Sequence, residues 1–244
     1  MFSAITPTEI SKYQVKTIVI DAGHGGKDPG CLGSVSKESD IALRIALELG
    51  RIVKENLKDV KVIYTRSTDK FVELHERAAI ANRNGADLFI SVHCNAAESK
   101  NAYGTETFAM GLHKTDGNLA VAKRENSVIL KESNQQSNYE GFDPNSDEDH
   151  IVIAQYQSAH IYNSLFLASK IESQFKNRVG KKSNGVKQAG FLVLWKTAMP
   201  SVLVETGFLT NLNDEKYLNN KHNQILMASG IYRAIKEYKL ELEK

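Results

Sequence analysis

Hydrophobic positions in the first part of the chain alternate between strand-like runs and helix-like repeats. KTIVIDAG (16–23), VKVIYTR (60–66) and ADLFISVHCNA (86–96) are short apolar runs rich in β-branched residues, which is typical of buried strands. Between them, ESDIALRIALELGRIVKENL (38–57) and ELHERAAIANRNG (73–85) repeat apolar residues at helical spacing. The order of strand, helix, strand, helix, strand predicts a largely parallel sheet covered by helices.

The second half of the chain predicts further strands and a closing helix. YGTETFAM (103–110), AGFLVLWKT (189–197) and PSVLVETGF (200–208) read as strands, and KHNQILMASGIYRAIKEYKLEL (221–242) as an amphipathic helix. We therefore expect an α/β fold with an open, mostly parallel mixed β-sheet of about six strands and helices on both faces. A length of 244 residues, 41% of them hydrophobic, fits a single domain.

Two polar segments fit this alternation poorly. LKESNQQSNYEGFDPNSDEDH (130–150) lies between the helical runs NLAVAKRENSVIL (118–130) and IVIAQYQSAHIYNSLFLASKIESQF (151–175) and has no clear periodicity. About 20 such residues inside a compact domain indicate a lid, a regulatory element or a mobile loop. We interpret KKSNGVKQ (181–188) as a solvated turn, with a groove for an anionic glycan as the alternative.

Charge and cysteine content exclude several classes of function. Thirty-one Lys and Arg residues against 29 Asp and Glu residues give a net charge of only +2, so neither a nucleic acid nor an anionic membrane is an expected partner. No run of about 18 apolar residues occurs, so we expect no membrane insertion. Cys31 and Cys94 have no CxxC spacing, which excludes a disulfide framework but permits one bridge.

Four candidate chemical side chains stand at the ends of predicted elements. His24 follows the first strand, while His93 and Glu205 end later strands, so the carboxyl edge of a parallel sheet can bring them together. Glu38 begins the helix that follows the His24 loop. Two imidazoles and a carboxylate form a catalytic zinc shell, and a second carboxylate can accept a proton from water. On spacing alone, hydrogen-bonded structural histidines are an equally good interpretation.

The glycines around His24 have two interpretations. GHGGKDPG (23–30) can form a tight turn, or it can cradle a phosphate. The segment contains neither GxGxxG nor GxxxxGK[ST], so the sequence favours the turn.

Five segments in one order resemble the zinc-dependent N-acetylmuramoyl-L-alanine amidases of the family called Amidase_3. The matching segments are IVIDAGHGGKDPG, ESDIALRIA, DLFISVHCNA, GTETF and VLVETGFLTN. The likeness runs from about Thr17 to Tyr238, and the fold of this family agrees with the predicted sheet. The resemblance implies a hydrolase that cleaves the amide bond between N-acetylmuramic acid and L-alanine in peptidoglycan.

The resemblance also implies roles for individual residues. His24, Glu38 and His93 would bind one Zn²⁺ per chain, and Glu205 would be the catalytic glutamate. Ser39 stands where the family commonly has lysine, which leaves the neighbouring Asp40 as an alternative ligand. Glu38 is preferred because Leu43 then falls on the leucine position of the family. The resemblance assigns no substrate-binding residues.

Five other histidines match no position of the family and are interpreted as surface or hydrogen-bonded structural residues: His75, His113, His150, His160 and His222. Arg66 and Arg77 either contact substrate or pair with nearby acids. Asp21 is the candidate acceptor for the second ring nitrogen of a ligand histidine.

Residues 112–169 resemble the regulatory insertion of cell-division amidases. AKRENS (122–127) and QSAHIYNS (157–164) match the flanks of a helix that plugs the active site until an activator protein displaces it. We expect one of three acidic residues in the polar segment to act as an internal inhibitory ligand: Glu132, Glu140 or Glu148. The alternative is an unstructured surface loop.

The resemblance further implies a role in cell-wall remodelling or daughter-cell separation, in the periplasm or cell envelope. Such a location requires an export signal, and the opening MFSAITPTEI lacks the basic and apolar parts of one. We expect an extension at 1–15 and a catalytic domain at 16–244. Two other functions remain open: a muramyl-peptide-binding module without activity, and a zinc peptidase acting on the stem peptide.

Overall fold

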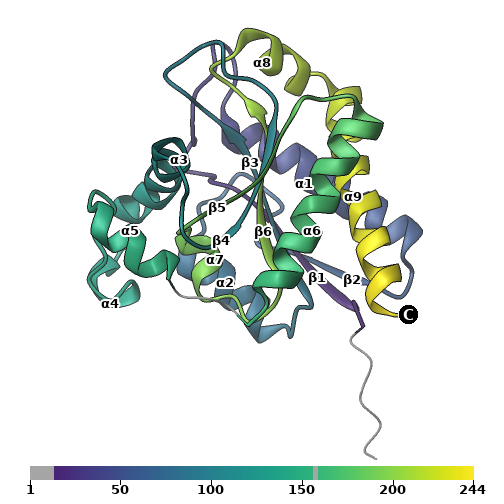
Figure 1. Ribbon diagram of the computed structural model, residues 1–244, viewed down its shortest axis with the longest axis horizontal. Coiled ribbons are helices and arrows are strands. Elements are labelled where there is room, and N and C mark those ends of the chain that lie inside the picture. The colour runs from purple at the N-terminus through teal and green to yellow at the C-terminus, as the bar shows by residue number, and fades with distance from the viewer. Residues whose placement is uncertain (1–13, 156–158) are drawn as a thin grey trace, which may run out of the picture.

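The computed structural model describes residues 14–155 and 159–244, and its centre is a six-stranded sheet with the order β2-β1-β3-β6-β4-β5 (Figure 1). The strands are β1 (Thr17–Ala22), β2 (Lys61–Tyr64), β3 (Leu88–Asn95), β4 (Thr105–Met110), β5 (Ser183–Ala189) and β6 (Ser201–Phe208). Within this sheet, β4 pairs antiparallel with β6 and the other neighbours pair in parallel. The predicted open, mostly parallel mixed sheet is confirmed.

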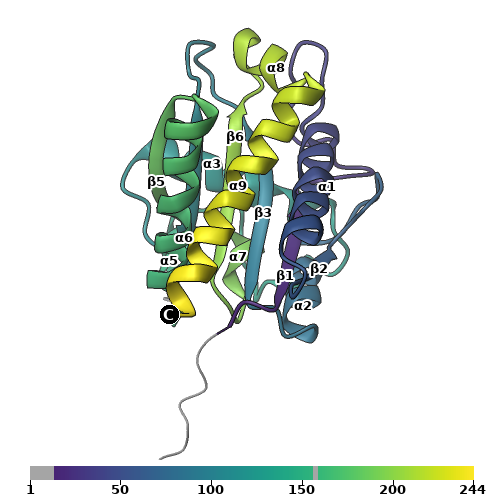
Figure 2. The same ribbon diagram turned by 90° about the vertical axis from the view of Figure 1, so that its right-hand side faces the viewer.

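Helices cover both faces of the sheet. The helices α1 (Glu38–Asn56), α6 (Ile161–Gln174) and α9 (Lys221–Leu242) lie side by side on one face (Figure 2). On the other face lie α2 (Leu74–Arg83), α3 (Asp116–Asn126) and α7 (Leu192–Trp195). Alternate residues of each strand point to opposite faces, so the sheet contributes to two apolar clusters, with Ile18 in one and Val19 in the other.

The remaining described elements are η1 (Ser127–Lys131), α4 (Gln135–Asn138), α5 (Asp147–Ala154), the π-helical turn η2 (Phe175–Val179) and α8 (Leu212–Leu218). Short helices therefore occupy much of segment 130–150, so the alternative of an unstructured loop is wrong. The predicted flank 157–164 falls partly outside the described residues. None of the described helices is both long enough and apolar enough to cross a membrane.

The strand predicted at 189–197 is wrong, and so is the turn predicted at 181–188. The fifth strand is β5, formed by the polar run, and the apolar residues after it form the short helix α7. β5 lies at the edge of the sheet and is mostly half-buried, so its sequence carries no strong apolar signal. In α7, Leu192, Val193 and Leu194 are buried, and a short buried run has the same pattern in a helix as in a strand.

The N-terminal extension predicted at 1–15 lies almost entirely outside the described residues. Val15, at its end, is buried in the domain core. Its amide donates to Glu243 at 2.9 Å, and its carbonyl accepts from Lys239 at 3.0 Å. Val15 therefore packs with the domain rather than apart from it.

Two buried arginines fix the loop that follows β1. Arg77 donates to Asp21 Oδ1 at 2.9 Å and to the carbonyl of His24 at 2.9 Å. Arg66 donates to the carbonyls of Gly23 at 2.6 Å and Ser39 at 2.8 Å. Both guanidinium groups are therefore engaged inside the domain. Arg77 pairs with an acid, as one of the two predicted roles had it, whereas Arg66 binds backbone carbonyls instead.

The substitution Arg77→Met is expected to lower the free energy of unfolding by about 3–5 kcal/mol, because it leaves the carboxylate of Asp21 buried without its counter-charge. Urea denaturation measures this change. The double variant Asp21→Asn/Arg77→Met should be more stable than Arg77→Met alone, because no buried charge is then unpaired. Equal stability of the two variants would contradict this account.

Candidate metal centre

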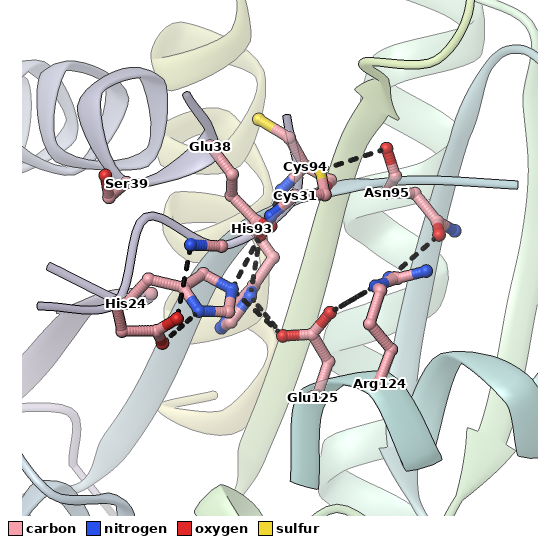
Figure 3. A network of polar contacts seen from close by, with 12 residues as sticks. His24, Cys31, Glu38, Ser39, His93, Cys94, Asn95, Arg124 and Glu125 are labelled. Atoms are coloured by element: carbon pink, nitrogen blue, oxygen red, sulfur yellow. Dashed lines mark hydrogen bonds and ion pairs between the residues drawn. The ribbon is translucent and has the colours of Figure 1, made fainter. Parts of the chain in front are cut away.

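Four side chains from different parts of the chain bring their ligand atoms into one buried cluster. His24, Glu38, His93 and Glu125 each contribute one atom, and these atoms lie within 4.8 Å of one another (Figure 3). Glu38 Oε1 is 3.1 Å from His24 Nε2 and 3.0 Å from His93 Nδ1. Glu125 Oε2 is 3.1 Å from each of the same two nitrogens. Two imidazole nitrogens and two carboxylate oxygens thus face one another.

The glycine loop allows this convergence. A Cβ at Gly23 would lie 2.4 Å from His93 Cε1, and a Cβ at Gly30 would lie 2.6 Å from Glu38 Oε2. Side chains at either position would therefore displace a member of the cluster. His24 itself has a φ of 58°, in the left-handed region that residues other than glycine rarely adopt. The tight turn favoured by the sequence brings the backbone close to the cluster.

Hydrogen bonds orient the cluster from outside. His24 Nδ1 is 2.6 Å from Asp28 Oδ2, and Glu38 accepts from the amides of Cys31 and Cys94, each at 2.9 Å. His93 Nε2 lies 3.1 Å from the hydroxyl of Ser91, which in turn donates to Asp21. Asp21 therefore reaches His93 through Ser91. Asp28 is the direct partner of His24, which the sequence did not indicate.

Unpaired atoms show that these residues fit a cation. His24 Nε2 and Glu125 Oε2 are buried and have no hydrogen-bond partner in the described part of the chain, although they lie 3.1 Å apart. Buried polar atoms without partners require a compensating group. Burial lowers the pKa of His24, but the carboxylates of Glu38 and Glu125 outweigh it and raise the pKa well above its usual value. The cluster thus favours positive charge, and its nitrogen and oxygen donors suit zinc.

Glu205 borders the cluster on β6, where it pairs in register with His93 of β3. Its side chain is fully buried, and burial together with the charge of Glu125 raises the pKa of Glu205 well above its usual value. Arg124 Nη2 lies 3.5 Å from Glu205 Oε1 and also contacts Glu125 at 2.9 Å. A carboxyl group that readily holds a proton therefore stands beside the cluster.

The structure brings none of the three predicted inhibitory glutamates into the cluster. Glu132 accepts from the amide of Leu74 and from the hydroxyl of Tyr139. Glu140 is exposed and pairs with Lys196, and the exposed Glu148 accepts from the hydroxyl of Ser146.

The acidic residue of segment 112–169 that reaches the cluster is Glu125, on α3. Glu125 lies within AKRENS (122–127), which resembles a flank of the inhibitory helix of cell-division amidases. That resemblance, and not the polar segment 130–150, was the sequence signal that could have identified it.

The cysteines and His150 have structural positions. Cys31 and Cys94 are both free, so the bridge that the sequence permits is not formed. Cys31 Sγ donates to the carbonyl of Cys94 at 3.1 Å, and burial raises the pKa of the Cys94 thiol well above its usual value. His150 is buried and lies 3.1 Å from the carbonyl of Pro144, which confirms its interpretation as a hydrogen-bonded structural residue.

One carboxylate holds the segment between the glycine loop and Glu38. Glu215 of α8 accepts from the hydroxyls of Ser34 and Ser36 and from the amides of Val35 and Ser36. Burial raises the pKa of Glu215, but these hydrogen bonds outweigh it and lower the pKa to about 2. The position of Glu38 therefore depends on a residue far away in the sequence.

Comparison with known proteins gives one consistent match. A family model, Amidase_3, described as N-acetylmuramoyl-L-alanine amidase, matches residues 18–237. The amidase AmiC of Escherichia coli O6:H1 is 34% identical over 239 residues, which cover 95% of this chain and 55% of AmiC. The amidase AmiA of Escherichia coli K12 is 33% identical over 228 residues, which cover 91% of this chain and 76% of AmiA. The chain thus spans about half of one relative and about three quarters of the other.

A solved structure supports the same relationship. The CwlD amidase from Clostridioides difficile, in complex with the GerS lipoprotein, matches this chain with a TM-score of 0.66 and 26% identity. The match covers 91% of this chain and 98% of the CwlD chain. Sequence and fold therefore agree over nearly the whole domain.

The substitution Glu215→Gln is expected to lower the free energy of unfolding at pH 7 by about 1.5–3 kcal/mol, because hydrogen bonds to a charged acceptor are lost. The pKa of Glu215 falls from 4.5 to about 2 on folding, so its stabilisation is present above pH 4.5 and disappears as the pH falls toward 2. Urea denaturation from pH 7 to pH 2 should show the two proteins converging. Glu98→Gln, at an exposed glutamate, is the control, and a constant difference across this range would contradict the prediction.

Proposed function

This chain belongs to the N-acetylmuramoyl-L-alanine amidase family, and from that membership we propose that it hydrolyses the amide bond between N-acetylmuramic acid and L-alanine in peptidoglycan. The observation that carries the proposal is the buried cluster of His24, Glu38, His93 and Glu125 beside the carboxyl group of Glu205. His24, Glu38 and His93 would hold one Zn²⁺. When bound there, the ion supplies a Lewis acid for the scissile carbonyl and lowers the pKa of water at the site.

Glu205 supplies the proton transfers of the proposed reaction. In its ionised form it accepts a proton from the attacking water, and it then delivers the proton to the departing nitrogen of L-alanine. Its raised pKa suits this second step, because amines leave poorly unless they are protonated. The residues around it exclude bulk water, since Glu205 is fully buried. The expected products are a muramyl carboxylate and a stem peptide that begins with a free L-alanine amino group.

Product analysis separates this function from the two alternatives. A new L-alanine amino terminus supports the amidase, whereas cleavage between amino acids would indicate a peptidase acting on the stem peptide. Binding without release of peptide would indicate a muramyl-peptide-binding module. A buried glutamate next to the cluster favours the enzyme, because binding alone requires no proton-transfer group.

We also propose that α3 holds the enzyme in an autoinhibited state. Glu125 Oε2 lies 3.1 Å from a nitrogen of each cluster histidine, so its carboxylate occupies the position where substrate would approach. The preceding residue, Arg124, places its Nη2 3.5 Å from Glu205 Oε1. In this proposal residues 112–169 form a regulatory insertion within a catalytic domain at 16–244, with residues 1–15 as an extension. An activator protein would draw α3 away.

The proposed biological setting follows from the substrate. Peptidoglycan lies outside the cytoplasmic membrane, so we propose a periplasmic or envelope location and a role in wall remodelling or daughter-cell separation. The complex of the CwlD amidase with the GerS lipoprotein supports the idea that a protein partner binds this domain.

Glu125→Ala is expected to raise the basal rate of peptidoglycan hydrolysis by about 10- to 100-fold, because a charged contact worth about 1.5–3 kcal/mol no longer holds α3 in the site. Release of soluble material from dye-labelled peptidoglycan measures the rate. Glu148→Ala is the matched control, since it removes an exposed glutamate of the same insertion and should leave the rate unchanged. An unchanged rate for Glu125→Ala would refute autoinhibition by this residue.

In the Glu125→Ala background, Glu205→Gln is expected to reduce the rate by about 10²- to 10⁴-fold through loss of proton transfer. Its zinc content should stay at about one ion per chain, whereas His93→Ala should lose the metal. Atomic absorption measures zinc, and mass spectrometry identifies the released amino terminus. A Glu205→Gln protein with full activity would overturn the assignment of the catalytic glutamate.

A further inference from the structure

The guanidinium group of Arg124, on α3, donates to a group of hydrogen-bond acceptors that includes Glu205. Its Nη1 donates to the carbonyl of Ala96 at 2.8 Å, and its Nη2 donates to Asn95 Oδ1 at 3.0 Å. The same Nη2 lies 3.5 Å from Glu205 Oε1. Figure 3 shows the guanidinium between Asn95 and Glu125, with its side chain rising from the helix. Asn95 ends β3, Ala96 follows it directly, and Glu205 lies within β6, so none of the three acceptors belongs to the insertion.

The acceptors are held in place without the help of α3. Asn95 is fully buried, and its Nδ2 donates to Glu106 Oε2 at 3.0 Å. An ionised carboxylate can only accept hydrogen bonds, so Glu106 forces the amide nitrogen of Asn95 toward itself and the oxygen toward Arg124. Lys187 holds Glu106 in turn, at 2.6 Å. The orientation of Asn95 is therefore set by the strands.

The chemistry of this set defines what can replace Arg124. The carbonyl of Ala96, the amide oxygen of Asn95 and the ionised form of Glu205 offer acceptors, and Asn95 and Glu205 are fully buried. Asn95 Oδ1 also accepts from the amide of Ala96 at 2.8 Å, so Arg124 is its second donor. When α3 departs, Ala96 O and Glu205 Oε1 lose the donor that Arg124 supplies, and Asn95 Oδ1 loses one of its two donors. Buried acceptors without donors are unfavourable, so the group that best replaces Arg124 brings N–H donors and carries a positive charge. The leaving group of the proposed reaction has these properties, because the nitrogen of L-alanine becomes an ammonium.

We propose that Ala96 O, Asn95 Oδ1 and Glu205 Oε1 form the subsite that receives the amino group of L-alanine, with Arg124 as its internal substitute. This inference rests on the proposed amidase function and names a substrate-binding role for Asn95. Hydrolysis of an amide yields one carboxylate and one amine. Consecutive residues of α3 present the same two charges, since Glu125 faces the cluster histidines and Arg124 faces the acceptors. α3 therefore occupies the site as a mimic of both products.

Binding of a product fragment tests the subsite without turnover. The probes are the dipeptide L-alanyl-D-isoglutamine and its N-acetylated form, titrated calorimetrically into the zinc-loaded full chain. Arg124→Ala should bind the free amine at least tenfold more tightly than the wild type does, and at least tenfold more tightly than it binds the acetylated probe. Glu125→Ala keeps Arg124 and should not gain this preference, and Arg83→Ala, at an exposed arginine, should behave as the wild type.

Second variants separate recognition from a general opening of the site. In the Arg124→Ala background, Asn95→Leu should abolish the preference for the free amine. Glu106→Gln is the conservative alternative, because it keeps a hydrogen-bonding group but frees Asn95 to turn its amide nitrogen toward the probe. It should reduce the preference at least threefold while urea denaturation still shows a folded protein.

Each result decides the proposal. Equal binding of both probes by Arg124→Ala, or binding of neither, would overturn the subsite even if the enzyme cleaves peptidoglycan. Retention of the preference in both second variants would remove the role of Asn95. Conversely, if Arg124→Ala prefers the free amine but Glu125→Ala releases no L-alanine terminus from peptidoglycan, the amidase function would be refuted and the subsite would stand.

Discussion

Three buried carboxylates meet at one edge of the sheet, and the need to compensate their charge governs the arrangement around them. Glu38, Glu125 and Glu205 come from α1, α3 and β6, and each is almost completely buried. Buried negative charges that lie close together are unfavourable unless positive charges lie between them. The histidine rings and Arg124 supply part of this compensation, and the geometry of the ligand atoms suits a divalent cation for the rest.

The loop at this edge of the sheet keeps its conformation because buried arginine side chains hydrogen-bond to its backbone. Arg66 and Arg77 bind carbonyl groups of the loop after β1, which keeps His24 in a left-handed conformation that is unfavourable for an isolated residue. Gly23 and Gly30 have no Cβ, so the backbone of the loop can approach the side chains of His93 and Glu38 closely. The loop is therefore stabilised by buried interactions that take no part in the chemistry itself, and the site depends on residues well outside it.

In the proposed autoinhibited state, the same constraint explains how one helix would control the site. Two consecutive residues of α3 carry opposite charges. Glu125 contacts the histidine rings, and Arg124 donates to the acceptors beside them. In this proposal α3 would contact the histidines and the buried acceptors as the two products would. Release by a partner would then require only that the helix move, since His93 and Glu205 lie on strands and Glu38 lies on α1. Regulation and substrate recognition would thus use the same contacts.

The sequence by itself determined the α/β class, the strand and helix order of the first half, and the closing helix. It also indicated His24, Glu38, His93 and Glu205 as candidates to meet at the sheet edge. These features follow from periodicity and from strand-end positions, which are local properties. Tertiary structure alone decided that β5 is a polar edge strand, that Glu125 rather than Glu132, Glu140 or Glu148 reaches the histidines, and that Arg66 and Arg77 are structural. Periodicity cannot tell which neighbour a helix face or a strand edge will meet, because that depends on how distant segments pack.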